Sequence, residues 1–471
     1  MSEIKVNKIS PRTACGTTTL GDSGDTITIP AGVTITNSGT AAGFGATGAV
    51  SWDTTAKTTG FTAVDGVGYF VNTTAGAITV TLPLSPAAGA VIGVSDYAGT
   101  SDTYAITIGR NGSNINGAAA DLIFAQENSA VTLVYVDGTQ GWKATDTSNL
   151  NDIELQPTYI TATGGTPTTS GDYKIHTFTG PGTFTVCSVG NPTGSDTLDY
   201  LVVAGGGSGG KARAGGGGAG GFRVSNGYGL CTPTMSPLAS LIALPVTATG
   251  YPITVGAGGA ATSGPGPGNV GLNSVFAGTT TITSAGGGGG GDDGNTGGDG
   301  GSGGGGGESS VGSLIGAGNT PPVSPSQGFP GGASDQAPPT GGPHPASPAP
   351  YAGGGGGGAS QQGNRGAPGG PGGLGSYIPS TNFGGSNGTA GPVSCAQYFA
   401  GGGGGIGCTS SSPGAAVPGG AGGGGTAPSP GTAGDATINT GGGGSAFGNT
   451  GAPGTSGAGG SGIVIIRYKF Q

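Results

Sequence analysis

Blocks of consecutive glycine limit what the second half of this chain can fold into. The stretch SAGGGGGGDDGNTGGDGGSGGGGG, residues 284–307, has almost no side chain that could enter a hydrophobic core. Glycine also loses more backbone entropy on ordering than any other residue. Any ordered structure here must therefore be held together by backbone hydrogen bonds. Eight such blocks recur, at residues 205–210, 215–221, 286–291, 303–307, 353–358, 401–405, 419–425 and 441–444.

The repeated blocks favour a bundle of polyglycine II helices. This extended threefold helix rises about 3.1 Å per residue and has no internal hydrogen bonds, so neighbouring chains must supply the partners. Only glycine permits that approach, because a Cβ would stand between the helices. A flexible linker would explain one or two blocks, and collagen needs a G-X-Y repeat that only residues 366–375 follow. The connections between blocks would become loops at the ends of the bundle.

The rest of the chain predicts β structure, because apolar residues alternate in short runs and sustained helical periodicity is absent. Residues 26–36, TITIPAGVTIT, predict short strands that need copies of themselves, most simply three chains around an axis. Residues 48–147 predict a β-sandwich or jelly-roll-like module with strands in AITVTLP, YAITIGR and AVTLVYVDG. Trp52 and Trp142 bracket this module and are interpreted as packing residues, the alternative being a binding platform.

The expected fold class is therefore all-β, in four parts. An attachment segment (1–47) precedes the β-module (48–147), a polar linker (148–163) follows, and a domain of β strands and polyglycine II helices occupies 164–471. That domain closes on the apolar run SGIVIIRYKF. We expect this last strand to pair with DYLVVAG at the start of the domain and so to clamp the glycine region shut.

Charge and cysteine content argue against several classes of function. Charged residues make up only 7% of the chain and its net charge is −9, so the basic footprint of nucleic-acid or anionic-membrane binding is missing. No apolar run approaches the roughly 18 residues of a membrane span, and no signal peptide is recognised. The five cysteines are scattered and are interpreted as reduced thiols, with a Cys395–Cys408 bridge left open. The aspartates are too irregular for calcium-binding repeats, so no metal or other cofactor is expected.

The larger side chains between the glycine blocks are the candidate binding residues. No catalytic residue is assigned and no enzyme is expected, because neither histidine stands in a catalytic motif. Aromatic rings on loops above a rigid scaffold suit stacking on sugars or filling receptor pockets, although they could equally cap the bundle as a small core. The receptor-binding candidates are Phe329, His344, Tyr351, Tyr377, Phe383, Tyr398, Phe399 and Phe447.

Three parts of the chain resemble fibre proteins of marine phages, including cyanophages. Residues 4–40, IKVNKISPRTACGTTTLGDSGDTITIPAGVTITNSGT, resemble the N-terminal segment of tail fibres. TLPLSPAAGAVIGVSDYAGT and VTLVYVDGTQGW resemble a β-module that recurs in such fibres. LDYLVVAGGGSGG, ITVGAGG and SGIVIIRY are similar to the glycine-rich domain of phage tail proteins, in which a polyglycine II core displays receptor-binding loops.

The resemblance implies a homotrimeric tail fibre of the virion, assembled in the host cytoplasm. Its N-terminal segment would join the tail or an adaptor protein, and its C-terminal loops would bind a polysaccharide or an outer-membrane protein of the bacterial surface. Nucleic-acid binding and membrane insertion are not expected. The alternatives are a purely structural virion protein without a receptor, an ice-binding protein, and a depolymerase.

Overall fold

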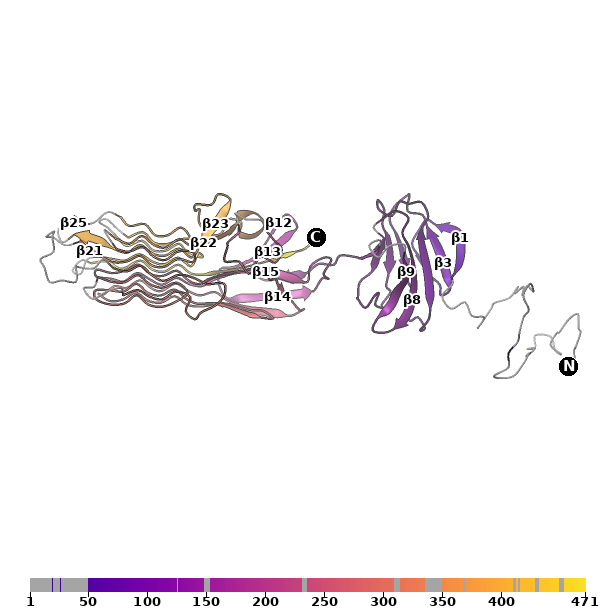
Figure 1. Cartoon of the computed structure of the whole chain (residues 1–471), viewed down its shortest axis with the longest axis horizontal. Coiled ribbons are helices and arrows are strands. Elements are labelled where there is room, and N and C mark those ends of the chain that lie inside the picture. Colours follow the sequence, from indigo (N-terminus) through magenta and orange to yellow (C-terminus); the bar gives the residue numbers. More distant parts are fainter. Residues whose placement is uncertain are drawn as a thin grey trace, which may run out of the picture.

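The computed structural model describes residues 50–124, 126–147, 153–230, 235–308, 314–334, 350–366, 369–409, 412–413, 416–427, 432–448 and 453–471, with Thr19 and Thr26. These residues form strands and extended segments with almost no helix, which bears out the all-β class (Figure 1). The predicted strands of 26–36, and the attachment segment around them, lie outside the described residues. No helix within the described ranges is long and apolar enough to cross a membrane.

The N-terminal module is a sandwich of two five-stranded sheets. One sheet has the order β1 (Ser51–Lys57), β3 (Val67–Val71), β5 (Val91–Asp96), β8 (Ala130–Asp137) and β9 (Gly141–Thr147). The other has the order β10 (Ile153–Leu155), β7 (Leu122–Phe124), β6 (Ile106–Gly109), β4 (Ile78–Thr81) and β2 (Phe61–Thr62). Alternate side chains of both sheets meet in one buried core. Strands β4, β6 and β8 confirm the three predicted strands.

Two details of the module differ from expectation. Strand β10 pairs with β7, and β11 (Thr161–Thr163) pairs with β14 (Gly182–Ser188) of the next sheet, so the predicted linker 148–163 contains two strands. Residues 156–160 alone separate them. The packing interpretation holds for Trp142, which is fully buried, whereas Trp52 remains 42% exposed.

A second pair of sheets, which we call the root sandwich, forms the base of the glycine-rich domain. Its first sheet has the order β11, β14, β18 (Gly250–Thr254), β19 (Ser274–Ala277) and β20 (Thr281–Ser284). Its second has the order β12 (Thr166–Ser170), β13 (Tyr173–Phe178), β26 (Ile463–Lys469), β15 (Thr197–Val203) and β16 (Phe222–Val224). Strand β17 (Leu244–Pro245) also pairs with β15. Rings such as Phe184 and Phe276 pack between the sheets against Val202 and Ile466.

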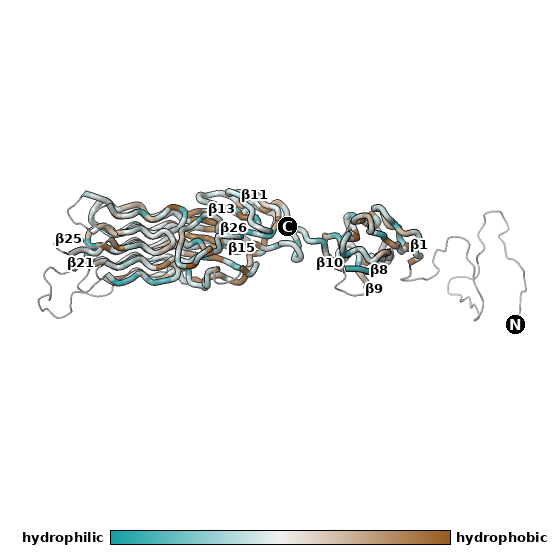
Figure 2. Tube along the Cα trace, turned by 90° about the horizontal axis from the view of Figure 1, so that it is seen from above, coloured by the Kyte–Doolittle hydropathy of each residue, from teal (hydrophilic) through white to brown (hydrophobic). Residues whose placement is uncertain are grey.

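The C-terminal strand β26 is the central strand of the second sheet. It pairs antiparallel with β13 and with β15, where Val203 lies opposite Ile463, and this confirms the predicted clamp. Ile466 packs into the core between the sheets, while Ile465 packs on the other face of the sheet. Both faces are covered, which is why the strand reads as an uninterrupted apolar run. Figure 2 shows the hydrophobic segments gathered around β13, β15 and β26.

Beyond the root sandwich, glycine segments run side by side as extended chains (Figures 1 and 2). Their hydrogen bonds have a three-residue period. In segment 205–211, residues 205, 208 and 211 donate their N–H groups to segment 266–272. Residues 206 and 209 donate to segment 457–460, and residues 207 and 210 donate to segment 215–218. Successive N–H groups therefore point in three directions, each toward a different neighbour.

Segment 215–221 lies at the centre of this glycine bundle. Its N–H groups donate to three segments and its carbonyl groups accept from three others. A Cβ on Gly217 would lie 2.2 Å from the carbonyl oxygen of Gly207, so side chains are excluded by neighbouring backbone. The block 419–425 lies outside this ring. The six surrounding segments are 204–210, 285–291, 302–305, 354–357, 403–406 and 441–444.

Segments on the outside of the bundle follow a different sequence rule. In 256–260 the glycines Gly256 and Gly259 are buried, whereas Ala257 and Ala260 are exposed. In 363–366 the two glycines are again buried and the two residues between them are exposed. In these two segments, therefore, only one position in three faces inward. The G-X-Y spacing continues through 366–375, but in 369–375 Gly370 and Gly373 are buried as well, so two positions in three face neighbouring segments there.

Candidate binding surface at the far end of the glycine bundle

The chain reverses direction at both ends of the bundle, and we call the end away from the root sandwich the distal end. The first pass leaves β15 and turns at 211–214, and a later pass turns at 292–296. The two turns meet through Glu308, whose N–H donates to the carbonyl of Arg213 at 2.9 Å. A small sheet of β21 (Pro350–Ala352), β24 (Gly407–Thr409) and β25 (Ser412–Pro413) also lies at this end (Figure 1).

Opposite charges gather at the distal turns. The Arg213 guanidinium lies 3.3 Å from the Glu308 carboxylate and 3.6 Å from that of Asp293. Partial burial raises the pKa of Glu308, and the nearby Arg213 opposes that rise. Because Arg213 and Asp293 keep a third to a half of their side-chain surface exposed, these pairs contribute little to stability.

A buried cation fixes a second group of distal turns. The Lys211 ammonium donates to the carbonyl of Ser263 at 2.6 Å and to that of Gly454 at 2.7 Å. It also lies 5.5 Å from the ring centroid of Phe447. Carbonyl dipoles and the ring face take the place of a carboxylate partner. Lys211 therefore ties three turns together and is not free to bind a ligand.

The topology divides the predicted aromatic residues between the two ends of the bundle. Tyr351 on β21 and Phe447 are distal, and His344 lies outside the described residues. The other five lie at the root: Phe329, whose carbonyl accepts from Gly303, and Tyr377, Phe383, Tyr398 and Phe399 of the hairpin formed by β22 (Ser376–Pro379), the turn η2 (Ser380–Gly384) and β23 (Ala396–Phe399).

The prediction of exposed rings is wrong for four of these residues. Phe383 and Phe399 are fully buried, and Tyr398 and Phe447 are 4% and 7% exposed. The first two join a core with Ile465 on the outer face of the second root sheet, because that apolar face would otherwise meet water. The alternative that the aromatic residues form a small core describes Phe383 and Phe399 correctly. Tyr377 is half-buried beside Tyr398, with their ring centroids 5.0 Å apart.

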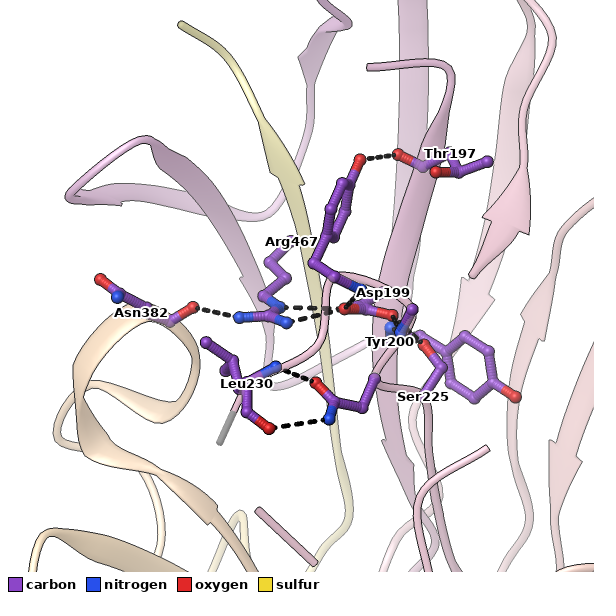
Figure 3. Close-up of polar contacts among 10 residues, drawn as sticks. Thr197, Asp199, Tyr200, Ser225, Leu230, Asn382 and Arg467 are labelled. Atoms are coloured by element: carbon purple, nitrogen blue, oxygen red, sulfur yellow. Dashed lines mark hydrogen bonds and ion pairs between the residues drawn. The ribbon is translucent and has the colours of Figure 1, made fainter. Parts of the chain in front are cut away.

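A buried polar cluster in the root sandwich was not predicted from the sequence (Figure 3). Asp199 of β15 accepts a hydrogen bond from Nη2 of Arg467 on β26 at 2.7 Å, and both side chains are fully buried. Ser225 and Gly227 donate to the other Asp199 oxygen at 2.7 Å each. Arg467 also donates to the Asn382 carbonyl at 3.1 Å. The available signal was an acidic residue, Asp199, in one apolar strand and two basic residues, Arg467 and Lys469, in the strand predicted to pair with it.

This cluster is a buried structural ion pair and not a ligand site. The guanidinium carbon lies 4.6 Å from the ring centroid of Phe383 and 4.8 Å from that of Tyr173. Its charge is thus enclosed by a carboxylate, a carbonyl and two rings, with both partners taken out of water. The pair joins the first and last strands of the glycine region to the β22–β23 hairpin.

The cysteine bridge left open by the sequence is not formed. Cys395 is a free, exposed thiol before β23 at the root, whereas the backbone of Cys408 pairs with Tyr351 in the distal sheet. The extended segment 400–406 lies between them. Within the described ranges, no three His, Cys, Asp or Glu side chains come together in a way that could hold a metal ion.

A family of glycine-rich domains matches residues 178–469, from the end of β13 to the end of β26. The match covers more than half of the chain and includes all eight glycine blocks, the central strand of the root sandwich and the distal turns. No curated protein matches the chain. From β13 to its C-terminal strand, the chain thus belongs to the glycine-rich domain family.

Proposed function

We propose that this protein is a phage tail fibre whose glycine bundle is a polyglycine II lattice that carries receptor-binding loops at its distal end. The three-residue hydrogen-bond period and the six neighbours of segment 215–221 support the lattice. The resemblance of residues 4–40 to tail-fibre N-termini supports attachment to the virion tail or an adaptor protein through that segment. Three copies would give useful avidity from individually weak contacts.

One observation carries the proposal for the binding end. Every pass of the bundle that leaves the root sandwich must turn at the distal end, while the chain enters the domain at β11, on the opposite side. The turns at 211–214, 263–266 and 292–296 are thus brought to one surface by a backbone lattice. In this lattice, almost no glycine can be replaced by a residue with a side chain. Binding residues are commonly carried by loops on such rigid scaffolds. The ligand would be a polysaccharide or an outer-membrane protein of the bacterial surface.

Site-directed blocking tests this proposal. In a full chain whose native cysteines are replaced by serine, Thr296→Cys places a thiol on an exposed distal turn, and Ile438→Cys places one on an exposed turn at the root. Each thiol is coupled to a polyethylene glycol chain, and adsorption of the labelled protein to a panel of marine bacterial cells is measured. We expect the distal adduct alone to abolish adsorption. Equal adsorption by both adducts would place the receptor surface elsewhere, and no adsorption by the unmodified protein would favour a purely structural fibre.

A further inference from the structure

The outer face of the first sheet of the N-terminal module carries an exposed tryptophan over a glycine floor. Trp52 on β1 lies opposite Gly68 of β3, which lies opposite Gly93 of β5. A Cβ on Gly68 would be 2.7 Å from the indole Cδ2, and a Cβ on Gly93 would be 3.3 Å from Cη2. The Val50 side chain shares this floor, with its Cγ2 at 2.8 Å from a Cβ on Gly68 and 2.9 Å from one on Gly93. The indole therefore spans two strands and packs on their backbones beside Val50.

This arrangement leaves a large part of the indole exposed. Trp52 is 42% exposed, although tryptophan is normally among the most buried residues of a sandwich. Glycine within a strand weakens the strand, and it commonly marks a place where another group approaches the backbone. Phe70 lies beside the indole, with the ring centroids 4.9 Å apart and the planes inclined by 31°. This separation and tilt are those of an offset-stacked pair, so the two rings form one apolar patch, which we call the platform.

Polar side chains border the platform on the same face of the sheet. The row that begins at Trp52 and the two glycines continues to Thr132 of β8 and then to Asp146 of β9. Thr132 is half-buried and Asp146 is exposed. Ser95 of β5 lies opposite Phe70 in the next row and is half-buried. Hydroxyl and carboxylate oxygens thus stand one and two strands away from Gly93, which the far end of the indole reaches.

We propose that this platform binds a pyranose ring of a neutral polysaccharide. The axial C–H groups of a pyranose with equatorial hydroxyls form a flat apolar face that fits an open indole, and Thr132 and Asp146 would bond the hydroxyls at its rim. The carboxylate of Asp146 disfavours acidic sugars. This site lies on the N-terminal module and is independent of the binding surface at the distal end of the glycine bundle.

Tryptophan fluorescence of the full chain tests the site. The protein has two tryptophans, and Trp142 is fully buried, so quenching of emission by acrylamide reports on Trp52. The probes are cellohexaose and the β-1,4-linked hexamer of N-acetylglucosamine, with sorbitol as the acyclic control. We expect either hexasaccharide to lower the quenching constant at least twofold, with a dissociation constant in the millimolar range, typical of a single-ring platform, and sorbitol to have no effect.

Two variants and a matched control assign the effect to the platform. In calorimetry, Trp52→Ala should weaken hexasaccharide binding at least tenfold, and Tyr104→Ala, at another exposed ring of the module, should leave it unchanged. Gly68→Val should lift the indole from the floor and weaken binding although Trp52 remains. The polyethylene glycol adduct of Thr296→Cys should bind the hexasaccharides normally, which separates this site from the distal one.

Three results would overturn the proposal. If Trp52 is as protected from acrylamide as a core residue before any sugar is added, the platform is covered by a second copy of the chain or by its own N-terminal segment. If Trp52→Ala binds the hexasaccharides as tightly as the unmodified chain, the sugar binds elsewhere. If neither hexasaccharide produces heat or protects Trp52 at tens of millimolar, the platform is not a saccharide site.

Discussion

Gly217→Ala should destabilise the glycine bundle strongly, although it adds only one methyl group. Gly217 lies in the central segment, and its N–H donates to the carbonyl of Gly444 while its own carbonyl accepts from Gly403, both at 2.9 Å. The added Cβ would lie 2.2 Å from the carbonyl oxygen of Gly207 and 2.7 Å from that of Ser208. These neighbours are backbone atoms within the lattice, so neither can rotate out of the way.

The expected loss is about 3 kcal/mol. Overpacking of a rigid interior costs roughly 1–3 kcal/mol, and opening the lattice weakens two or three hydrogen bonds worth about 1 kcal/mol each. Replacing glycine by alanine recovers about 0.4–1 kcal/mol, because the unfolded chain becomes less flexible. For a domain of this size, with an unfolding entropy of about 2 cal/mol/K per residue, that loss lowers Tm by about 5 °C.

Thermal unfolding of the full chain, followed by calorimetry, measures this effect. The control is Gly264→Ala, on an exposed distal turn where an added Cβ would meet no atom within 4 Å. We expect the control to keep or slightly raise Tm. If the two variants melt within 1 °C of each other, segment 215–221 is not packed at the centre of a backbone lattice, and the reasoning fails.

Two other buried groups give testable consequences. Nδ1–H of neutral His176 donates to the carbonyl of Gly164, the Tyr468 hydroxyl lies 3.2 Å from Nε2, and burial lowers the pKa of His176 below 6.5. The unfolded chain therefore binds the proton more readily than the folded chain. The free energy of unfolding should be highest above pH 6.5, and it should fall by up to about 1.4 kcal/mol per pH unit as pH drops from 6.5 through the folded pKa. Denaturant titrations between pH 7.5 and 5.5 measure this slope, and an equal slope in His176→Phe would contradict it. Arg467→Met leaves the Asp199 carboxylate buried without its cation and should cost about 3–5 kcal/mol. The double variant with Asp199→Asn should recover much of that loss, and no recovery would mean that Arg467 acts only through packing.

Strand pairing in the root sandwich could be predicted from the sequence because its apolar runs are distinctive. LVV before the first glycine block and IVII at the C-terminus are the longest apolar runs that flank the glycine region, and burial on both faces of one sheet suits them. The charges of Asp199 and Arg467 then fall opposite each other. Spacing alone could not show that this pair is fully desolvated.

The order of the glycine segments could not be predicted, because glycine blocks carry no side chains that distinguish one neighbour from another. The place of each aromatic residue was equally hidden. Whether a connection lies at the root or at the distal end depends on how many passes precede it, and short turns such as 300–302 and 421–423 were not recognised as reversals. The sequence thus places Tyr398 and Phe399 on loops at the ends of the bundle, whereas Phe399 lies in the core of the root and Tyr398 is buried beside Tyr377.

Hydrogen exchange of the backbone amides in segment 215–221 tests most directly whether the glycine region is a hydrogen-bonded bundle. All seven N–H groups of this segment donate to carbonyl groups of neighbouring segments. If opening them requires unfolding of the domain, their exchange should be slowed by a factor of about 10⁴ or more, as for the central strand β26. Exchange of these amides at the rate of an unstructured chain, while β26 remains protected, would contradict the bundle.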